Sequence, residues 1–244
     1  MCRLLGWSAP GGTTPVQVAD GGAERLRQLS RLHEDGWGAA WYDHGSLHRV
    51  REVDPAHSSS AFDAALAQTV SDVGLVHLRW ATDQIPTRLP NTHPFVHGDV
   101  AFAHNGALRR GPGLDALVDA DLLDSAEGDT DSERYFLALM SARRRTSSVP
   151  EAVAKLLAEL GDDGWSSLNF VMTEPGRLYA LCRFDADRRP ADTEPDYFQM
   201  HFSVSSGSTA VWSSGVRERT GSELPNGHLL IADTTSGEVR LQPV

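Results

Sequence analysis

Cys2 directly follows the initiator methionine and carries one of the two thiols in this sequence. Methionine aminopeptidases remove Met1 when the second residue is small, and cysteine meets that requirement. Removal would leave a thiol and a free α-amine on one residue, and an α-amine has an unperturbed pKa of about 7.7–8.0. Such an amine can act as a base near neutral pH, so the position predicts an N-terminal nucleophile. A cysteine at position 2 can also be incidental, and other residues must decide.

Five segments elsewhere in the chain carry the supporting groups: Asp35–Gly38, Val76–Thr82, Asn91–Phe95, Ala103–Ala107 and Gly128–Glu133. Together with Met1–Gly6, and in this order, they resemble the class II glutamine amidotransferase domain, a branch of the N-terminal-nucleophile hydrolase superfamily. The matching motifs run from Cys2 to Glu133, and the rest of the chain agrees only in its strand-rich character. The resemblance is to stand-alone members, which include the γ-glutamyl amidohydrolase of ergothioneine biosynthesis.

The resemblance implies a catalytic group made of Cys2, Asn105 and Gly106. Cys2 is the nucleophile in this reading. The side-chain amide of Asn105 and the backbone N–H of Gly106 stabilise the developing oxyanion, and glycine allows close approach. Taken alone, Asn-Gly is equally typical of a hairpin turn. Its place just after the apolar segment 100–103, with Arg79 upstream, favours the site.

The resemblance also implies a group that binds the charged ends of an amino acid. Arg79 holds the α-carboxylate, which suits a planar guanidinium better than a lysine. Trp80 and Thr82 belong to the same substrate-binding segment, and Asp131 receives the α-ammonium. The residues alone leave two alternatives open. Arg79 could be a surface arginine on an edge strand, and Asp131 could serve only the dipole of the helix that it begins.

Three further residues are expected to line the pocket: Gly36, Trp37 and His93. Core packing explains Trp37 equally well. His93 could be mistaken for a catalytic base, but the family uses the α-amine, so the resemblance gives His93 a lining or structural role.

Departures from the family pattern leave the substrate and the pathway open. Large synthase members commonly have a histidine after the Arg-Trp-Ala-Thr segment, whereas this chain has Asp83. The sequence shows no acceptor, isomerase or ATP-dependent synthase domain. We therefore expect an amidohydrolase that acts on glutamine or a γ-glutamyl amide through a γ-glutamyl thioester, with no cofactor. The alternatives are an ammonia-donating glutaminase subunit of a separate synthase, and a catalytically silent γ-glutamyl-binding protein.

Composition narrows the possible partners. The net charge of −11 argues against a nucleic-acid partner, because phosphate binding requires a basic face. No apolar run approaches the ~20 residues of a membrane helix, and no secretory signal precedes Cys2, so we expect a cytoplasmic protein.

Cys182 lies in an apolar run and is interpreted as a core residue. His93 and His97 have helical ligand spacing, but Pro94 between them disfavours a metal site.

The elements that must position these residues indicate an α+β fold. A strand is predicted over 2–7 with a loop over 8–15, and a hairpin over 36–51 turns at Asp43–Gly45. Helices are grouped in the middle of the chain, and Thr130–Glu133 reads as a capping box that begins one of them. The last third of the chain is nearly all strand. We expect one domain over 1–244, built as a four-layer αββα sandwich with two antiparallel sheets between helical layers.

Overall fold

The computed structural model of the chain describes residues 2–19, 22–81, 85–191, 193–217 and 221–244. Its strands form two sheets, and every pairing within them is antiparallel. The first sheet contains β1 (Arg3–Thr13), β2 (Trp37–Asp43), β3 (Ser46–Glu52), β4 (Ser71–Leu78), β9 (Met200–Ser205), β10 (Ser208–Ser213) and β11 (Ser222–Leu224). Within the described residues its order is β11-β9-β10-β1-β4-β2-β3, so β1 and β4 lie near its centre.

The second sheet contains β5 (Phe95–His97), β6 (Val100–Asn105), β7 (Asn169–Glu174), β8 (Arg177–Cys182), β12 (His228–Asp233) and β13 (Val239–Pro243). Its order across the described strands is β13-β12-β8-β7-β6-β5. The strand-rich last third of the chain therefore does not form a unit of its own. It completes both sheets, with β9 to β11 in the first and β12 and β13 in the second.

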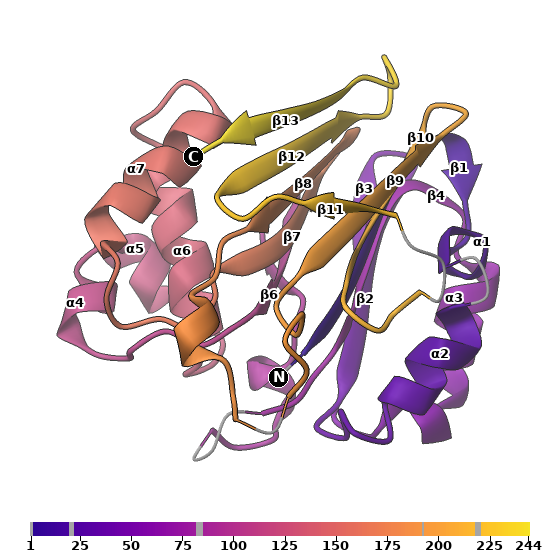
Figure 1. Cartoon of the computed structure of the whole chain (residues 1–244), viewed down its shortest axis with the longest axis horizontal. Coiled ribbons are helices and arrows are strands. Elements are labelled where there is room, and N and C mark those ends of the chain that lie inside the picture. The colour runs from indigo at the N-terminus through magenta and orange to yellow at the C-terminus, as the bar shows by residue number, and fades with distance from the viewer. Residues whose placement is uncertain (1, 20–21, 82–84, 192, 218–220) are drawn as a thin grey trace.

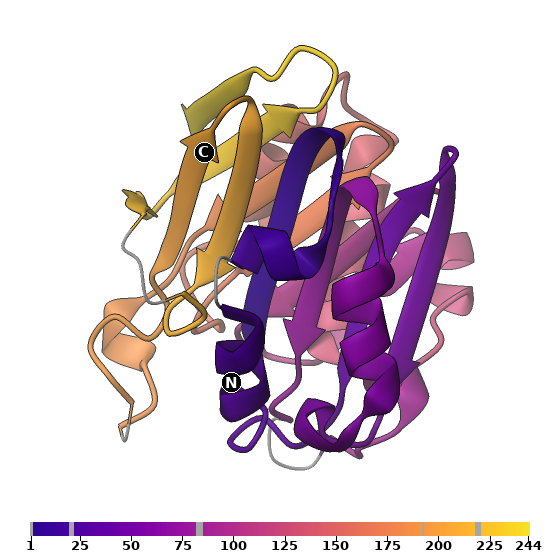
Figure 2. The ribbon, with the colours of Figure 1, turned by 90° about the vertical axis from the view of Figure 1, so that its right-hand side faces the viewer.

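Helices cover the outer faces of both sheets. The helices are α1 (Pro15–Ala19), α2 (Gly22–Leu29), α3 (Ser60–Gln68), α4 (Pro112–Asp115), α5 (Ala120–Asp124), α6 (Asp131–Arg143) and α7 (Val149–Leu160), with short 3-10 turns η1 (Ala56–Ser58), η2 (Leu89–Asn91) and η3 (Ala186–Arg188). Figure 1 shows α4 to α7 beside the second sheet and α1 to α3 beside the first. In Figure 2 the helices α1 to α3 lie in front of the first sheet. The predicted αββα sandwich is confirmed.

Side-chain alternation along each strand separates three apolar cores. On β1, Leu4 packs between the sheets, whereas Leu5 and Trp7 pack under the helices of the first layer. On β6, Ala103 faces the space between the sheets and Phe102 faces α6. This alternation decides which polar residues at the strand ends face the space between the sheets.

Two local predictions needed correction. The first strand does not stop at Trp7, since β1 continues to Thr13 through the predicted loop, with a shift in register between Ser8 and Thr13. The predicted capping box at α6 forms only in part. Thr130 accepts a hydrogen bond from the Glu133 N–H at 3.0 Å, as expected. The Glu133 carboxylate, however, accepts from the N–H groups of Glu127 and Gly128, both at 2.8 Å, and so closes the preceding loop.

None of the described helices has the length and apolar character needed to span a bilayer.

Candidate active site

The start of β1, the end of β4 and the start of β2 lie side by side at one edge of the first sheet. Arg3 at the start of β1 pairs with Leu78 at the end of β4, and Leu78 also pairs with Trp37 at the start of β2. Extending the β1–β4 register by one residue places Cys2 opposite Arg79. Both share the inner face of the sheet with Leu4 and His77. Figure 1 shows β1 beginning at this lower edge, where the N-terminus lies.

The Cys2 side chain is buried, with 8% exposed. Its Sγ lies 3.7 Å from the carbonyl oxygen of Trp80, a long and weak hydrogen-bond contact. Burial raises the pKa of this thiol, while the positive charges of Arg79 and Arg3 oppose the rise. A buried thiol of this kind needs a base to give up its proton. Met1, whose removal would free the α-amine, lies outside the described residues.

Arg79 is buried, and protein oxygens hold its guanidinium in place. Nη1 donates to the carbonyl oxygen of Asp35 at 3.3 Å and to the Thr87 hydroxyl at 3.4 Å, and Nη2 donates to the Pro86 carbonyl at 3.5 Å. These contacts are long for hydrogen bonds from a charged group. An anionic ligand could therefore form shorter and stronger hydrogen bonds with the guanidinium than these protein oxygens do. Arg79 is therefore not a surface arginine on an edge strand. Thr82, which was predicted to belong to the same substrate-binding segment, lies outside the described residues.

Asp35 connects the segments around Arg79, a role that the sequence did not reveal. One carboxylate oxygen accepts from the Ala81 N–H at 2.7 Å, and the other accepts from the Thr87 hydroxyl at 3.1 Å. The Arg79 N–H also donates to the Gly36 carbonyl at 2.8 Å. The sequence signal was available, because Asp35 directly precedes the predicted Gly36 and Trp37.

Asn105 ends β6 on the facing sheet, with its side chain on the same inner face as Ala101 and Ala103. It is fully buried, and neither its Oδ1 nor its Nδ2 has a hydrogen-bond partner among the described residues. Asn169, directly opposite in register on β7, has both amide atoms paired. An unpaired buried amide costs free energy unless a ligand satisfies it. Asn105 thus has a free donor where a substrate oxygen could bind, and it belongs to a strand and not to a hairpin turn.

Gly106 cannot be replaced without moving the backbone. A Cβ at this position would lie 1.9 Å from the Ser167 carbonyl oxygen. The neighbouring His104 donates from Nε2 to the same carbonyl at 3.0 Å, so its Nδ1, at 2.9 Å, accepts from the Ser132 hydroxyl. These contacts fix the backbone on either side of Asn105.

Asp131 is the first residue of α6 and is buried. Its Oδ2 accepts from the Leu108 N–H at 2.7 Å, which ties the helix to the segment that follows Gly106. Asp131 therefore does more than complement the helix dipole. Its carboxylate lies beside the same loop as the two oxyanion candidates, where it could receive an ammonium group.

The predicted lining residues divide into two groups. His93 lies between the sheets, where its ring packs on that of His77 at a centroid distance of 4.1 Å. Gly36, with φ +108°, has a backbone conformation that favours glycine and contacts Arg79 through its carbonyl. Trp37 instead points to the other face of β2, packs against Phe62 and donates to Glu52 at 3.1 Å. The structure thus places Trp37 in the helix-facing core and not with the other site residues.

Trp80 lies at the surface beside Cys2. Its side chain is 42% exposed, and its ring contacts the edge of the His33 ring at 5.4 Å. Its backbone carbonyl is the oxygen that faces the Cys2 thiol. The structure therefore places Trp80 at the edge of the site, where its ring is accessible.

The buried histidines near this site are weak bases. Burial lowers the pKa of His33 to about 2 and that of His77 to about 3. Burial also lowers the pKa of His93 well below its usual value. These imidazoles are neutral near pH 7 and compete poorly for a thiol proton. In the part of the chain that the structure describes, no three His, Cys, Asp or Glu side chains are grouped to hold a metal ion.

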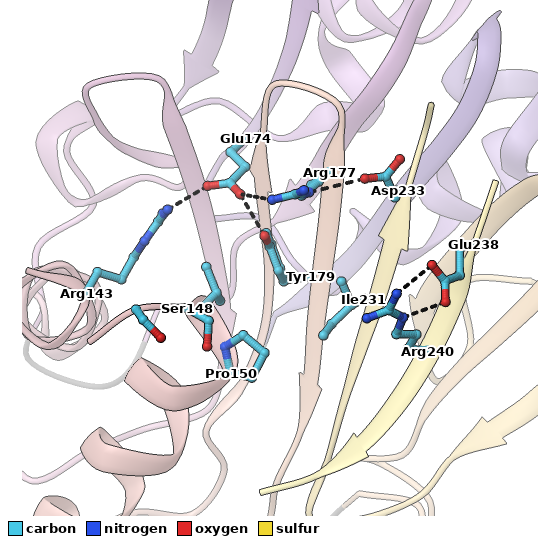
Figure 3. Close-up of a pocket in the computed structure, with 12 residues that line it drawn as sticks. Arg143, Ser148, Pro150, Glu174, Arg177, Tyr179, Ile231, Asp233, Glu238 and Arg240 are labelled. Atoms are coloured by element: carbon cyan, nitrogen blue, oxygen red, sulfur yellow. Dashed lines mark hydrogen bonds and ion pairs between the residues drawn. The ribbon is translucent and has the colours of Figure 1, made fainter. Parts of the chain in front are cut away.

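A separate cavity of about 370 Å³ opens beside the start of α7, next to the β7–β8 and β12–β13 hairpins (Figure 3). Three arginines line it, and each is paired with a carboxylate of the protein. The pairs are Arg143–Glu174 at 2.7 Å, Arg177–Asp233 at 3.3 Å and Arg240–Glu238 at 2.6 Å. Because these charges are already neutralised, we assign no ligand to this cavity.

Comparison with solved structures supports the fold. The chain matches a glutamine aminotransferase class-II domain protein from Silicibacter pomeroyi with a TM-score of 0.66 and 20% identity, and the match covers 99% of both chains. It also matches the glutamine phosphoribosylpyrophosphate amidotransferase of B. subtilis with a TM-score of 0.64 and 16% identity, covering 99% of this chain and 49% of the other.

Curated relatives share more of the sequence. The glutamine–fructose-6-phosphate aminotransferase of Vibrio vulnificus is 29% identical over 184 residues, which cover 73% of this chain and 28% of the relative. The γ-glutamyl-hercynylcysteine sulfoxide hydrolase of Mycobacterium tuberculosis is 28% identical over 136 residues, which cover 50% of this chain and 58% of the relative. The chain spans less than two thirds of the length of these relatives. Residues 1–191 match the family described as class-II glutamine amidotransferases, and the chain therefore belongs to that family.

Proposed function

We propose that the chain hydrolyses the side-chain amide of glutamine or of a γ-glutamyl compound, with Cys2 as the nucleophile. One observation carries the proposal. The buried Cys2 thiol lies opposite Arg79 on one sheet, and the facing sheet presents the unpaired amide of Asn105 at the end of β6. Membership of the class-II family and the hydrolase relative from Mycobacterium tuberculosis support the same reaction class.

The proposed reaction needs one base and two oxyanion donors. After loss of Met1, the α-amine of Cys2 takes the thiol proton, and the sulfur attacks the amide carbon. The carbonyl oxygen becomes an oxyanion that accepts from the Asn105 amide and the Gly106 N–H. The C–N bond then breaks, the departing amine takes the proton from the α-ammonium, and a γ-glutamyl thioester remains. Water attacks that thioester, releasing glutamate and restoring the thiol.

Arg79 and Asp131 select the amino-acid end of the substrate in this proposal. The guanidinium binds the α-carboxylate, and the Asp131 carboxylate binds the α-ammonium. Both groups are buried, so their interactions with a substrate are weakly screened by salt. A substrate that lacks either charge would leave a buried protein charge unpaired.

Arg79→Lys tests this recognition. Lysine keeps the charge but loses the planar fork, so we expect KM for glutamine to rise about 10-fold to 100-fold, with a smaller change in kcat. Initial rates over a range of glutamine concentrations measure both constants. An unchanged KM would remove Arg79 from the substrate site.

The test of the proposed function is turnover by mature protein. We expect release of ammonia or amine from glutamine or from one of a panel of γ-glutamyl amides, and an intact-mass shift on Cys2 when the thioester is trapped by rapid acid quenching. Binding of these compounds without turnover or adduct would contradict the proposal and indicate a silent γ-glutamyl-binding protein.

A second candidate is an ammonia-donating subunit that serves a separate synthase. The Vibrio relative favours it, because its name describes an aminotransferase and the chain covers only 28% of its length. Glutaminase activity that appears only when a co-purifying synthase is added would support this candidate. Full turnover by the isolated chain would support the hydrolase.

A further inference from the structure

The residue after the nucleophile makes contacts that the proposed reaction does not use. Arg3 is only 9% exposed, and its Nη1 donates to the backbone carbonyl oxygen of Cys2 at 3.1 Å. A buried guanidinium without compensating contacts would be costly, and this hydrogen bond is one such contact. It also gives the Cys2 carbonyl a charged donor from the adjacent residue.

Tyr197 supports that guanidinium from a distant part of the chain. The Arg3 guanidinium carbon lies 4.5 Å from the centroid of the Tyr197 ring, within the range of a cation–π contact. Tyr197 is itself buried, and its backbone is held. Its N–H donates to the Glu194 carbonyl at 3.0 Å, and its carbonyl accepts from the Ser214 hydroxyl at 3.0 Å. Tyr197 lies beyond residue 191, where the family match ends.

These groups also act on each other through charge. Among the described side chains, the charged and titratable groups that interact with Cys2 are Arg3 on β1, Arg79 after β4 and Tyr197 before β9. Burial raises the pKa of Tyr197 to about 12. The phenol is therefore neutral at pH 7 and does not cancel the positive charge of Arg3. Arg3 also contributes, after burial, to the low pKa of His33.

We propose that Arg3, packed on Tyr197, is a positioning residue that fixes the backbone of Cys2 and places a second positive charge beside its reacting groups. The inference rests on the proposed role of Cys2 as nucleophile. It gives the segment 194–199 a part in the active site, although that segment contains none of the family motifs. The charge of Arg3 favours the thiolate and the unprotonated α-amine, because a neighbouring cation stabilises an anion and disfavours a second cation.

The test measures the reactivity of Cys2 directly. In mature protein, the rate of Cys2 alkylation by iodoacetamide is followed against pH with peptide mass spectrometry, which separates Cys2 from Cys182. Arg3→Gln removes the charge but keeps a donor for the Cys2 carbonyl. We expect the midpoint of alkylation to rise by about one pH unit, and the acidic limb of the amidase profile to move in the same direction.

Two further variants separate charge from position. Arg3→Lys keeps the charge but loses the planar stack, and Tyr197→Leu removes the ring beneath it. We expect both to keep the alkylation midpoint within a few tenths of a pH unit and to lower kcat about 10-fold with little change in KM. The matched control is Arg217→Gln. Its guanidinium lies 4.3 Å over Trp212, and it borders a cavity that includes Thr13, at the far end of β1 from Cys2.

The outcomes distinguish this inference from the proposed function. Arg3→Gln with a wild-type alkylation midpoint and wild-type kcat would overturn the inference, even if amide hydrolysis is demonstrated. If Arg3→Gln does not fold, wild-type kcat in both Arg3→Lys and Tyr197→Leu would overturn it. A raised alkylation midpoint in Arg3→Gln, absent from Arg217→Gln, would support the inference even if no amide is turned over.

Discussion

Replacing Cys2 with alanine is expected to abolish amide hydrolysis and to leave the fold intact. The substitution removes the only proposed nucleophile, so no thioester forms, and kcat/KM should fall by a factor on the order of 10⁴ or more. The structural cost is small, because among the described residues the thiol's hydrogen bonding is limited to a weak contact with the Trp80 carbonyl at 3.7 Å. Ammonia release from glutamine measures activity, and thermal unfolding followed by circular dichroism measures stability.

Cys182→Ala is the matched control. This second cysteine is fully buried on β8, in the core between the sheets, and burial raises the pKa of its thiol to about 12. It is therefore inert at neutral pH, and we expect its loss to reduce stability but not the chemical rate. Substantial turnover by Cys2→Ala, or complete inactivation by Cys182→Ala in folded protein, would contradict the assignment of the nucleophile.

Asn105→Ala is expected to lower kcat by about 10²–10³, the effect of removing one oxyanion donor, with a much smaller change in KM. The expected effect on stability is unusual for a buried polar residue. Neither amide atom of Asn105 has a hydrogen-bond partner among the described residues, so the substitution breaks no internal hydrogen bond. We therefore expect folded Asn105→Ala protein with an unfolding midpoint in urea close to that of the wild type.

Asn169→Ala provides the comparison. Asn169 lies opposite Asn105 in register, but its Nδ2 donates to the Phe198 carbonyl at 2.6 Å and its Oδ1 accepts from the Arg183 N–H at 2.8 Å. Removing that amide leaves one buried and one partly buried backbone group unpaired, and the buried group alone should cost about 1–3 kcal/mol. An Asn105→Ala variant with wild-type kcat would exclude Asn105 from the oxyanion site.

The sequence predicted the elements that carry the site better than the directions of some side chains. The strand at 100–103 and the helix that begins near Thr130 placed Asn105 and Asp131 at element ends, where the structure has them. Trp37 was expected in the pocket, but alternation along β2 turns its ring to the helices. A shift of one residue along a strand reverses the face on which each side chain lies. The short sequence Gly36-Trp37-Gly38 does not determine which face the Trp37 ring takes.

The sequence could not reveal contacts between distant segments. The sequence around Arg3 does not indicate a contact with Tyr197. The two residues meet only because β10 pairs with β1 and β9 pairs with β10, which brings the segment before β9 close to Arg3. Asp35 was visible within a motif, yet its role depends on where residues 81 and 87 lie in the folded chain. Such contacts are set by sheet order, which local propensity does not determine.

The division of the candidate site between two sheets has a mechanical consequence. Cys2 is carried by one sheet and Asn105 by the other, so their alignment depends on how closely the sheets are pressed together. At Gly6 the gap is narrow enough that an added Cβ would lie 2.6 Å from a Val171 methyl carbon. Reaction rates respond steeply to sub-ångström misplacement of reacting groups. A substitution that moves the two sheets slightly apart would therefore lower kcat before it changes the circular dichroism spectrum or the unfolding midpoint.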